Sequence, residues 1–230
     1  MQKPNAKNQN TIVIIAGPSL TGKSNLASLL AEQGFVQLIS STTRAPREGE
    51  IDGVHYHFLS KDEFRRQLSQ KKFLEHVEVD ARMEEIDGKL VKSEGNFYGM
   101  GLDDAHRAFG TGRPVVAVCE PTGVKAIYQR SMEEGWSPVR VFLNNKQELL
   151  VQRFLERFKN DAKAKPEAYA ARLIKMVDFE RKNWVEPARD GTDPYEIVFP
   201  TFEAANEIEV LHDVLKRVGV GYKPKRSPSP

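Results

Sequence analysis

The 230-residue sequence has few of the features that would assign a protein to a class at once. A single cysteine, Cys119, excludes an internal disulfide and gives no sign of an oxidising compartment. The apolar run near the start, Thr11 to Ala16, is too short for a secretory signal or a membrane span. The net charge is only +2, so no overall field marks a nucleic-acid binder. We therefore expect a cytoplasmic protein with neither membrane nor nucleic-acid partners.

Hydrophobic patterning predicts an α/β fold. Apolar residues make up 40% of the chain and charged residues 29%, as in ordinary globular domains. Short apolar runs predict the buried strands of a central parallel sheet, at residues 11–17, 114–120, 138–144 and 195–200. Helical periodicity separates them, at residues 24–34, 146–159, 166–184 and 203–218. The stretch before residue 114 is rich in Thr, Tyr, His, Phe and Gly, which predicts an inserted subdomain with antiparallel strands.

Residues 17–24 read GPSLTGKS and match the phosphate-loop pattern G-x-x-x-x-G-K-[ST] between a predicted strand and a predicted helix. In such a loop, backbone N–H groups wrap the phosphates, the lysine reaches their oxygens and the final hydroxyl can ligate Mg²⁺. The sequence therefore predicts a nucleoside triphosphate site with Ser24 as the metal ligand. The predicted donor-binding residues are Gly17, Pro18, Ser19, Leu20, Thr21, Gly22, Lys23 and Ser24.

Residues 40–58, SSTTRAPREGEIDGVHYHF, hold a dense set of hydrogen-bond donors. Arg44 and Arg47 lie three residues apart, with Thr42, Thr43 and Tyr56 nearby. Guanidinium groups bind phosphate oxygens from more than one direction, so this segment is a candidate phosphate grip. A solvated basic turn before a hairpin is the alternative reading of the segment taken alone.

The sequence resembles the guanylate kinase family in these two segments and in FLEHVEV, GNFYG and a downstream arginine-bearing helix. The resemblance covers residues 11–215 and implies ATP:GMP phosphotransfer, with Mg²⁺ accompanying the ATP. It implies a P-loop NTPase fold with a kinase core at 11–39, 106–152 and 185–220, an NMP-binding subdomain at 40–105 and a lid at 153–184. Within the subdomain we expect a hairpin insertion at 81–94. The composition of residues 1–10 and 221–230 predicts disordered tails. The partners would be ATP and a nucleoside monophosphate, on a monomer or dimer.

The same resemblance implies roles on the acceptor side. Arg44, Arg47, Tyr56 and Tyr98 would hold the acceptor phosphate, and Glu50 would orient the arginines. Ser40 and Glu75 would face the base. A carboxylate suits guanine because its N1–H and N2 amine are adjacent donors, whereas adenine N1 is an acceptor.

Arginines on the helices after residue 146 would complete the set of residues that bind the transferring phosphoryl group. Arg153 and Arg157 are four residues apart and project from one helical face, and Arg172 follows on the next helix. The resemblance implies lid arginines that neutralise charge on the transferring phosphoryl group, a role we assign to Arg157 and Arg172 before Arg153. The predicted catalytic groups are Lys23, Arg44, Arg157 and Arg172. No general base is required, because the acceptor phosphate is already anionic.

Four positions depart from the family's pattern. Val118 and Glu120 stand where the family has two aspartates, the second near the base, which leaves Mg²⁺ to Ser24, the phosphates and water. Met100 replaces a small hydroxyl residue beside the base. The segment 81–94 is extra, and Asp87-Gly88 predicts a hairpin turn within it. The family's Asn-Asp after the last strand is Phe199-Pro200-Thr201 here.

These departures leave two other functions open. One is a kinase of the same fold that acts on a modified or deoxy nucleotide or a sugar phosphate. The other is a guanylate-kinase-like module that binds peptides without catalysis, although such modules tend to lose the loop lysine and the lid arginines, which are present here.

Overall fold

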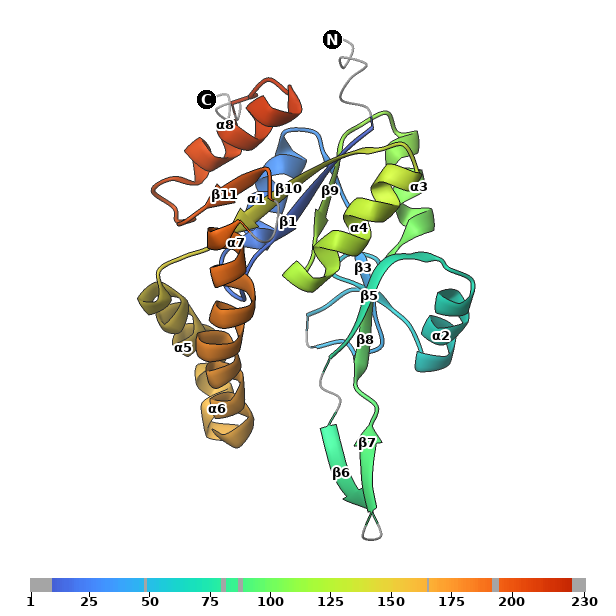
Figure 1. Ribbon diagram of the computed structural model, residues 1–230, viewed down its shortest axis with the longest axis vertical. Coiled ribbons are helices and arrows are strands. Elements are labelled where there is room, and N and C mark those ends of the chain that lie inside the picture. Colours follow the sequence, from blue (N-terminus) through green and yellow to red (C-terminus); the bar gives the residue numbers. More distant parts are fainter. Residues whose placement is uncertain are drawn as a thin grey trace. The chain divides into compact units, whose positions relative to one another are not determined.

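The structure is a computed structural model that describes residues 10–47, 49–79, 82–86, 89–164, 166–191 and 195–224, with only the backbone of 82–86, 89–93 and 160–164. The chain divides into two units, one of Met1–Gln37 with Gly112–Pro230 and the other of Leu38–Thr111. Figure 1 labels most elements of both.

A five-stranded sheet with the order β11-β10-β1-β9-β2 forms the centre of the first unit, and all its strand pairs are parallel. The strands are β1 (Thr11–Ala16), β2 (Val36–Gln37), β9 (Val115–Val118), β10 (Ser137–Leu143) and β11 (Ile197–Phe199). Every residue of β1 is buried, as expected of a central parallel strand that is covered on both faces.

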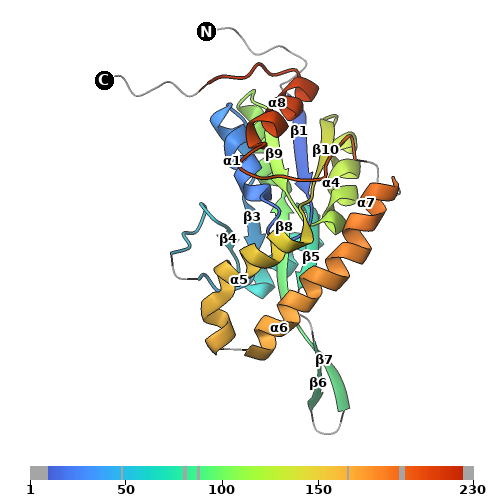
Figure 2. The same cartoon turned by 90° about the vertical axis from the view of Figure 1, so that its left-hand side faces the viewer.

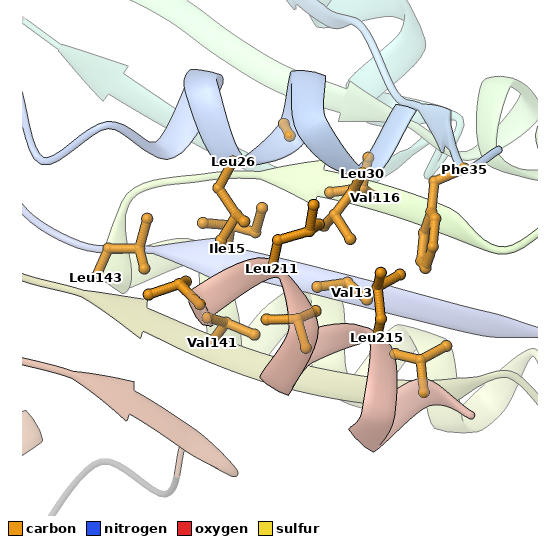
Figure 3. Packing of buried hydrophobic residues seen from close by; sticks show 14 of the residues in the cluster. Val13, Ile15, Leu26, Leu30, Phe35, Val116, Val141, Leu143, Leu211 and Leu215 are labelled. Atoms are coloured by element: carbon orange, nitrogen blue, oxygen red, sulfur yellow. The ribbon is translucent and has the colours of Figure 1, made fainter. Parts of the chain in front are cut away.

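Helices α1 (Lys23–Glu32) and α8 (Glu207–Val218) cover one face of this sheet. Figure 3 shows Leu26 and Leu30 of α1 and Leu211 and Leu215 of α8 packed over Val13, Ile15 and their strand neighbours. All four leucines are at most 1% exposed. Full burial of a leucine side chain contributes roughly 1.5–3 kcal/mol each, so this layer fixes β1 and α1, and with them the loop between the two.

The opposite face of the sheet packs against other helices. Helix α4 (Pro121–Glu133) contacts β1 and β10. Phe142 points to this face, because side chains alternate along a strand and its neighbours Val141 and Leu143 belong to the α1–α8 layer. There Phe142 packs against Trp184 and Ala188.

A helical hairpin extends from the first unit. Helix α5 (Gln147–Ala164) runs outward with a non-helical residue at Phe158, where φ is −110° and ψ is 17°. Helix α6 (Pro166–Ile174), the π-helix η2 (Lys175–Val185) and α7 (Glu186–Asp190) return as one continuous run. Figure 2 shows α5 beside this returning run, and a small apolar cluster around Leu150, Phe154 and Met176 joins them.

The second unit has a four-stranded sheet with the order β4-β3-β8-β5. Strand β8 is antiparallel to β3 and β5, whereas β3 and β4 are parallel. The elements are β3 (Ser40–Thr42), β4 (His57–Phe58), α2 (Lys61–Ser69), β5 (Phe73–Val79), β8 (Asn96–Gly101) and α3 (Leu102–Gly110). Phe64 of α2 stacks on Phe73 and Phe97, with ring centroids 4.4 and 5.4 Å away, and anchors the helix on the sheet.

Strands β6 (Arg82–Ile86) and β7 (Lys89–Ser93) pair in antiparallel register, from Arg82 with Ser93 to Ile86 with Lys89. Figure 1 shows this pair beyond the ends of β5 and β8. It occupies the extra segment found in the sequence, and the predicted Asp87-Gly88 turn lies outside the described residues.

The predicted fold class is confirmed: the chain is α/β, with a central parallel sheet flanked by helices. One predicted helix, 166–184, is in fact α6 followed by η2. The buried residues of η2, Met176, Glu180 and Trp184, recur every four residues, a spacing that also suits an α-helix, so the sequence pattern does not separate the two. Within the described part of the chain, no helix is both long and apolar enough to cross a bilayer.

Candidate active site

The segment 17–24 forms a tight loop between β1 and α1, both of which are fixed by the buried core. Gly17 has φ +148°, and a Cβ there would lie 2.1 Å from the carbonyl oxygen of Leu143 on β10. Gly22 has φ +96°, and a Cβ there would lie 2.6 Å from the Phe202 ring. Neither position accepts a side chain, so both glycines are required by the path of the loop.

Lys23, the first residue of α1, turns back over the loop. Its Nζ donates hydrogen bonds of 2.8 Å to the carbonyl oxygens of Gly17 and Pro18. Burial lowers the pKa of the Lys23 ammonium below its ordinary value, and the charges of Glu180 and Glu120 oppose this shift. The arrangement holds a cation directly over the curl of the loop, where a phosphate chain would lie.

Two helices of the extended hairpin hold the middle of the loop. The Ser19 N–H and hydroxyl donate to the Glu180 carboxylate of η2, at 2.7 and 2.8 Å. Arg153 of α5 donates to the carbonyl oxygen of Leu20, at 2.9 Å. Leu20 has φ +65°, a left-handed conformation that is unfavourable for leucine. The strained residue is therefore flanked by contacts from both helices.

Asn145 links the loop to the chain after β11. Its side-chain amide donates to the carbonyl oxygens of Phe202 and Thr21, at 2.9 and 3.3 Å, and its oxygen accepts from the Phe202 N–H at 2.8 Å. Asn145 is only 5% exposed. A buried amide with three partners fixes the segments that it joins.

Glu120 and Val118 lie at the end of β9, next to β1. Val118 pairs in register with Ile15, and Glu120 precedes the first residue of α4. Glu120 is near enough to Lys23 to raise its pKa, although Val118 supplies no carboxylate. The place near the acceptor base that the resemblance implies for Glu120 stays a prediction.

In the second unit, the residues predicted to face the base form one row across three strands. Ser40 of β3 pairs with Met100 of β8, and Met100 pairs with Glu75 of β5. Paired residues of antiparallel strands project to the same face, so the three side chains are neighbours. A register shift between Phe73 and Glu75 brings the carboxylate into this row. Met100 is fully buried between its two polar neighbours.

Thr42 lies two residues after Ser40 on β3, and it pairs with Tyr98 of β8. Tyr98, which is predicted to hold the acceptor phosphate, therefore lies on the same face of the sheet as Ser40 and Met100. The Tyr98 and Tyr56 rings meet edge to face, with centroids 6.1 Å apart. The Arg44 guanidinium lies 5.5 Å from the centroid of the Tyr56 ring. These contacts place Arg44, Tyr56 and Tyr98 in one cluster.

Glu50 organises both arginines of the segment. Its two oxygens accept from Nη1 and Nη2 of Arg44, each at 2.9 Å, and Oε2 also accepts from the Arg47 N–H at 2.8 Å. Hydrogen bonds from Arg44 and from the Arg47 backbone lower the pKa of Glu50 to about 2. The carboxylate is thus ionised throughout the neutral range and holds the guanidinium of Arg44 in a fixed plane.

The two arginines predicted for the lid lie near one aromatic ring. The guanidinium carbons of Arg157 and Arg172 are 5.5 and 5.1 Å from the centroid of Phe158. Phe158 is also the non-helical residue of α5, so the residue at which this helix is kinked is the one whose ring lies near both arginines. Arg157 and Arg172 are exposed, whereas Arg153 is half-buried against the loop.

Within the described residues, no group of three or more His, Cys, Asp or Glu side chains is arranged to hold a metal ion. The exposed hydroxyl of Ser24 at the start of α1 is consistent with a Mg²⁺ ion that takes most of its ligands from phosphates and water. A pocket of about 300 Å³ opens beside the loop between α5 and η2, and its walls include Pro18, Asn145, Gln147, Leu150, Met176 and Arg181.

Sequence reasoning missed Glu180, Asn145 and the position of Phe158. Glu180 lies 161 residues from Ser19 along the chain, and no local pattern marks so distant a partner. For Glu180, the one available signal was its charge at a position that helical periodicity assigns to the buried face. For Asn145, the signal was a polar residue directly after a buried strand.

Comparisons with known proteins agree with this geometry. The family model "Guanylate kinase" matches residues 9–179. Curated relatives called guanylate kinase include one from Clostridium perfringens (strain SM101 / Type A), 32% identical over 136 residues, 58% of this chain and 56% of the relative. Another, from Campylobacter jejuni, is 38% identical over 146 residues, 62% of this chain and 63% of the relative. A third, from Wolinella succinogenes, is 29% identical over 224 residues, 96% of each chain.

The chain thus spans only 56% and 63% of the first two of these relatives, and nearly all of the third. Among solved structures, the guanylate kinase from Anaplasma phagocytophilum superposes with a TM-score of 0.59 at 23% identity, over 90% of this chain and 85% of that one. At this identity the superposition supports the fold alone. The family model covers most of the described chain, including the phosphate loop and the arginine-rich segment. The chain belongs to the guanylate kinase family.

Proposed function

We propose that this protein transfers the γ-phosphoryl group of ATP to GMP or dGMP. An oxygen of the acceptor phosphate attacks the γ-phosphorus, the bond to the β–γ bridging oxygen breaks, and ADP and a guanosine diphosphate result. The attacking oxygen is already anionic, so no proton has to leave it. The protein's contribution is to position two polyanions and to stabilise the charge between them.

The observation that carries the proposal is the intact phosphate loop of a guanylate kinase family member. Gly17 and Gly22 leave the space that the loop requires, and Lys23 holds a cation over it. Binding modules of this kind that have lost catalysis tend to lose such a lysine. When bound, Mg²⁺ neutralises phosphate charge, and the residue here that would meet it is Ser24.

The acceptor side of the proposal rests on two groups in the second unit. Glu50 fixes Arg44 by two hydrogen bonds, which supports binding of a phosphate through a rigid guanidinium. Ser40 and Glu75 flank Met100 in one row, which supports recognition of a base that presents adjacent N–H donors. Adenine would leave the Glu75 carboxylate without a matching donor.

In the proposed mechanism, Arg157 and Arg172 of the lid neutralise the charge that develops on the transferring group. Their common neighbour Phe158 supports a shared role, because both guanidinium groups lie within 5.5 Å of its ring centroid. Ser24 would lie on the metal side of the triphosphate, and Glu120 near the acceptor base. The protein is proposed to act in the cytoplasm, where its lone thiol stays reduced, as a monomer or dimer.

One observation favours a second candidate function, transfer to an altered guanine nucleotide. Met100 fills the middle of the row between Ser40 and Glu75 with a flexible apolar side chain. A methionine offers no hydrogen bond to an unmodified base, and it adapts readily to an added apolar substituent.

A coupled assay with ATP–Mg²⁺ across GMP, dGMP, AMP, dTMP and ribose bisphosphate tests both functions. We expect GMP and dGMP to react with the largest kcat/KM, and AMP at least about 100-fold more slowly. A larger kcat/KM for a modified guanine nucleotide would replace the first function by the second. Titration calorimetry with ATP–Mg²⁺ separates either kinase from a binding module, which should give no heat.

A further inference from the structure

We propose that Glu180 is a positioning residue, which holds the Ser19–Leu20–Thr21 segment of the phosphate loop in the shape that receives the triphosphate. The inference rests on the proposed function, since it concerns the donor site of that reaction. Glu180 is not in direct contact with the reacting atoms. It acts through Ser19.

The first argument is the strain in the loop. Leu20 has φ +65°, and a left-handed leucine costs about 1–2 kcal/mol relative to its preferred conformations. A conformation of this kind persists only where its surroundings impose it. Thr21 is held by its own hydroxyl, which donates to the Pro18 carbonyl at 2.9 Å. The described contacts around Leu20 are the Glu180 bonds to the preceding Ser19, the Arg153 bond to the Leu20 carbonyl, and packing of the Leu20 side chain against the apolar cluster of the two helices.

The second argument is the geometry of those contacts. The Ser19 N–H and hydroxyl bind separate oxygens of Glu180, and the Leu20 carbonyl accepts from Arg153. The strained residue is thus gripped on its N-terminal side by a carboxylate and on its C-terminal side by a guanidinium. Arg153 lies on α5 together with Arg157, and Glu180 lies on η2, which continues directly from α6, the helix of Arg172.

The third argument is the burial of the carboxylate. Glu180 is 2% exposed, and burial raises the pKa of its carboxyl even though the Ser19 hydrogen bonds and Lys23 oppose the shift. Burying a carboxylate is unfavourable unless hydrogen bonds replace those it made with water. The two described donors to the Glu180 carboxylate both belong to Ser19 of the phosphate loop. The irregular helix η2, which contains Glu180, is therefore tied to the loop through one side chain.

The consequence is that the donor site and the lid are mechanically connected. A lid movement that withdraws Glu180 would release Ser19 and let Leu20 relax. A loop held by Glu180 meets the triphosphate already in its strained conformation, which reduces the ordering needed on binding. Loss of the carboxylate should therefore weaken ATP binding and leave acceptor binding unchanged.

Two variants and a matched control test the proposal. Glu180→Ala removes both hydrogen bonds, so we expect the Kd and KM for ATP to rise about tenfold, with the KM for GMP within twofold of wild type. Glu180→Gln should restore ATP affinity to within about threefold, because its oxygen can accept from the Ser19 N–H while its amide donates to the Ser19 hydroxyl. Asp178→Asn, an exposed change on the same helix, should alter neither constant.

Amide hydrogen exchange in the nucleotide-free protein supplies an independent readout. Exchange of a peptide spanning residues 17–24 should accelerate in Glu180→Ala and remain at the wild-type rate in Glu180→Gln and Asp178→Asn. If Glu180→Ala does not fold, Ser19→Ala, which removes one of the two bonds, should raise the Kd for ATP about threefold.

The proposal is overturned if Glu180→Ala binds ATP as tightly as wild type or more tightly, or if the KM for GMP rises as much as that for ATP. It also fails if the wild-type chain binds no ATP. Binding and exchange are measured without an acceptor. A chain that binds ATP with the expected pattern and yet forms no GDP would therefore retain this inference and lose the proposed function.

Discussion

Arg44 and Glu50 are joined by two hydrogen bonds of 2.9 Å, with Nη1 to Oε2 and Nη2 to Oε1. The two residues are only six positions apart along the chain. The Glu50 N–H also donates to the Arg47 carbonyl at 3.0 Å. The candidate acceptor arginine is therefore oriented by its own segment. This bidentate pair gives the second unit a preformed cationic group.

The Arg44–Glu50 pair predicts that the difference in stability between wild type and Glu50→Gln depends on pH. The pKa of Glu50 falls from 4.5 to about 2 in the folded protein. A group with a lowered folded pKa stabilises the protein above its unfolded pKa, and this contribution disappears as the pH falls between the two values. The urea midpoints of wild type and Glu50→Gln should thus differ near pH 6 and converge as the pH falls from 4.5 toward 2.

An exposed carboxylate serves as the control for this series. Asp190→Asn should give the same pH dependence of the urea midpoint as wild type. A constant difference between wild type and Glu50→Gln at every pH would show that the Arg44 pair does not perturb Glu50.

The row of Ser40, Met100 and Glu75 predicts base selectivity. Glu75→Gln replaces a double acceptor by a group with one acceptor, so kcat/KM for GMP should fall about 100-fold or more, while the slow rate with AMP stays nearly constant. Glu78→Gln is the matched control on the same strand, because Glu78 points to the opposite face and accepts from the Gly95 N–H. Equal losses for GMP and AMP in Glu75→Gln would remove Glu75 from base recognition.

Phe158 predicts coupled behaviour of the lid arginines. Phe158→Ala removes the ring that Arg157 and Arg172 share as a neighbour, so kcat should fall about tenfold while the KM values for ATP and GMP change less. Phe158→Tyr keeps the ring and should retain most of kcat. If Phe158→Ala turns over at the wild-type rate and Arg157→Ala does not, the ring has no part in positioning.

The close approach of Gly17 to β10 predicts that a side chain at this position lowers both stability and ATP affinity. Gly17→Ala would place a Cβ 2.1 Å from the Leu143 carbonyl oxygen, so the loop must shift. We expect a loss of about 1–3 kcal/mol in the free energy of unfolding and at least a tenfold rise in the Kd for ATP. Ser28→Ala, which removes an exposed hydroxyl from α1, should change both quantities little. A normal ATP affinity in Gly17→Ala would mean that the triphosphate binds elsewhere.

The sequence predicts those parts of the fold where local pattern and buried position agree. The run TIVIIA forms β1 because six consecutive apolar or β-branched residues suit a strand covered on both faces. Helix α2 was overlooked because most of its residues are charged and only Phe64 is buried. Its N-terminal signal was nevertheless present, since Ser60 accepts from the Glu63 N–H in the S-x-x-E pattern.

The candidate site is less predictable than the fold for a physical reason. The glycine loop and the Arg44–Glu50 turn are local, so their residues could be named from short motifs. The row of Ser40, Met100 and Glu75 depends on the strand register and on the irregularity before Glu75. The bonds from Glu180 to Ser19 depend on how a distant irregular helix packs, which no short pattern encodes.

The most direct test of the account is to incubate the chain with ATP–Mg²⁺ and GMP and to quantify ADP and GDP together. We predict equal amounts of ADP and GDP from wild type, and a rate at least about 1,000-fold lower from Lys23→Met, which removes the cation over the loop. Formation of ADP without GDP, or the absence of both from a folded protein that binds GMP, would contradict the proposed transfer.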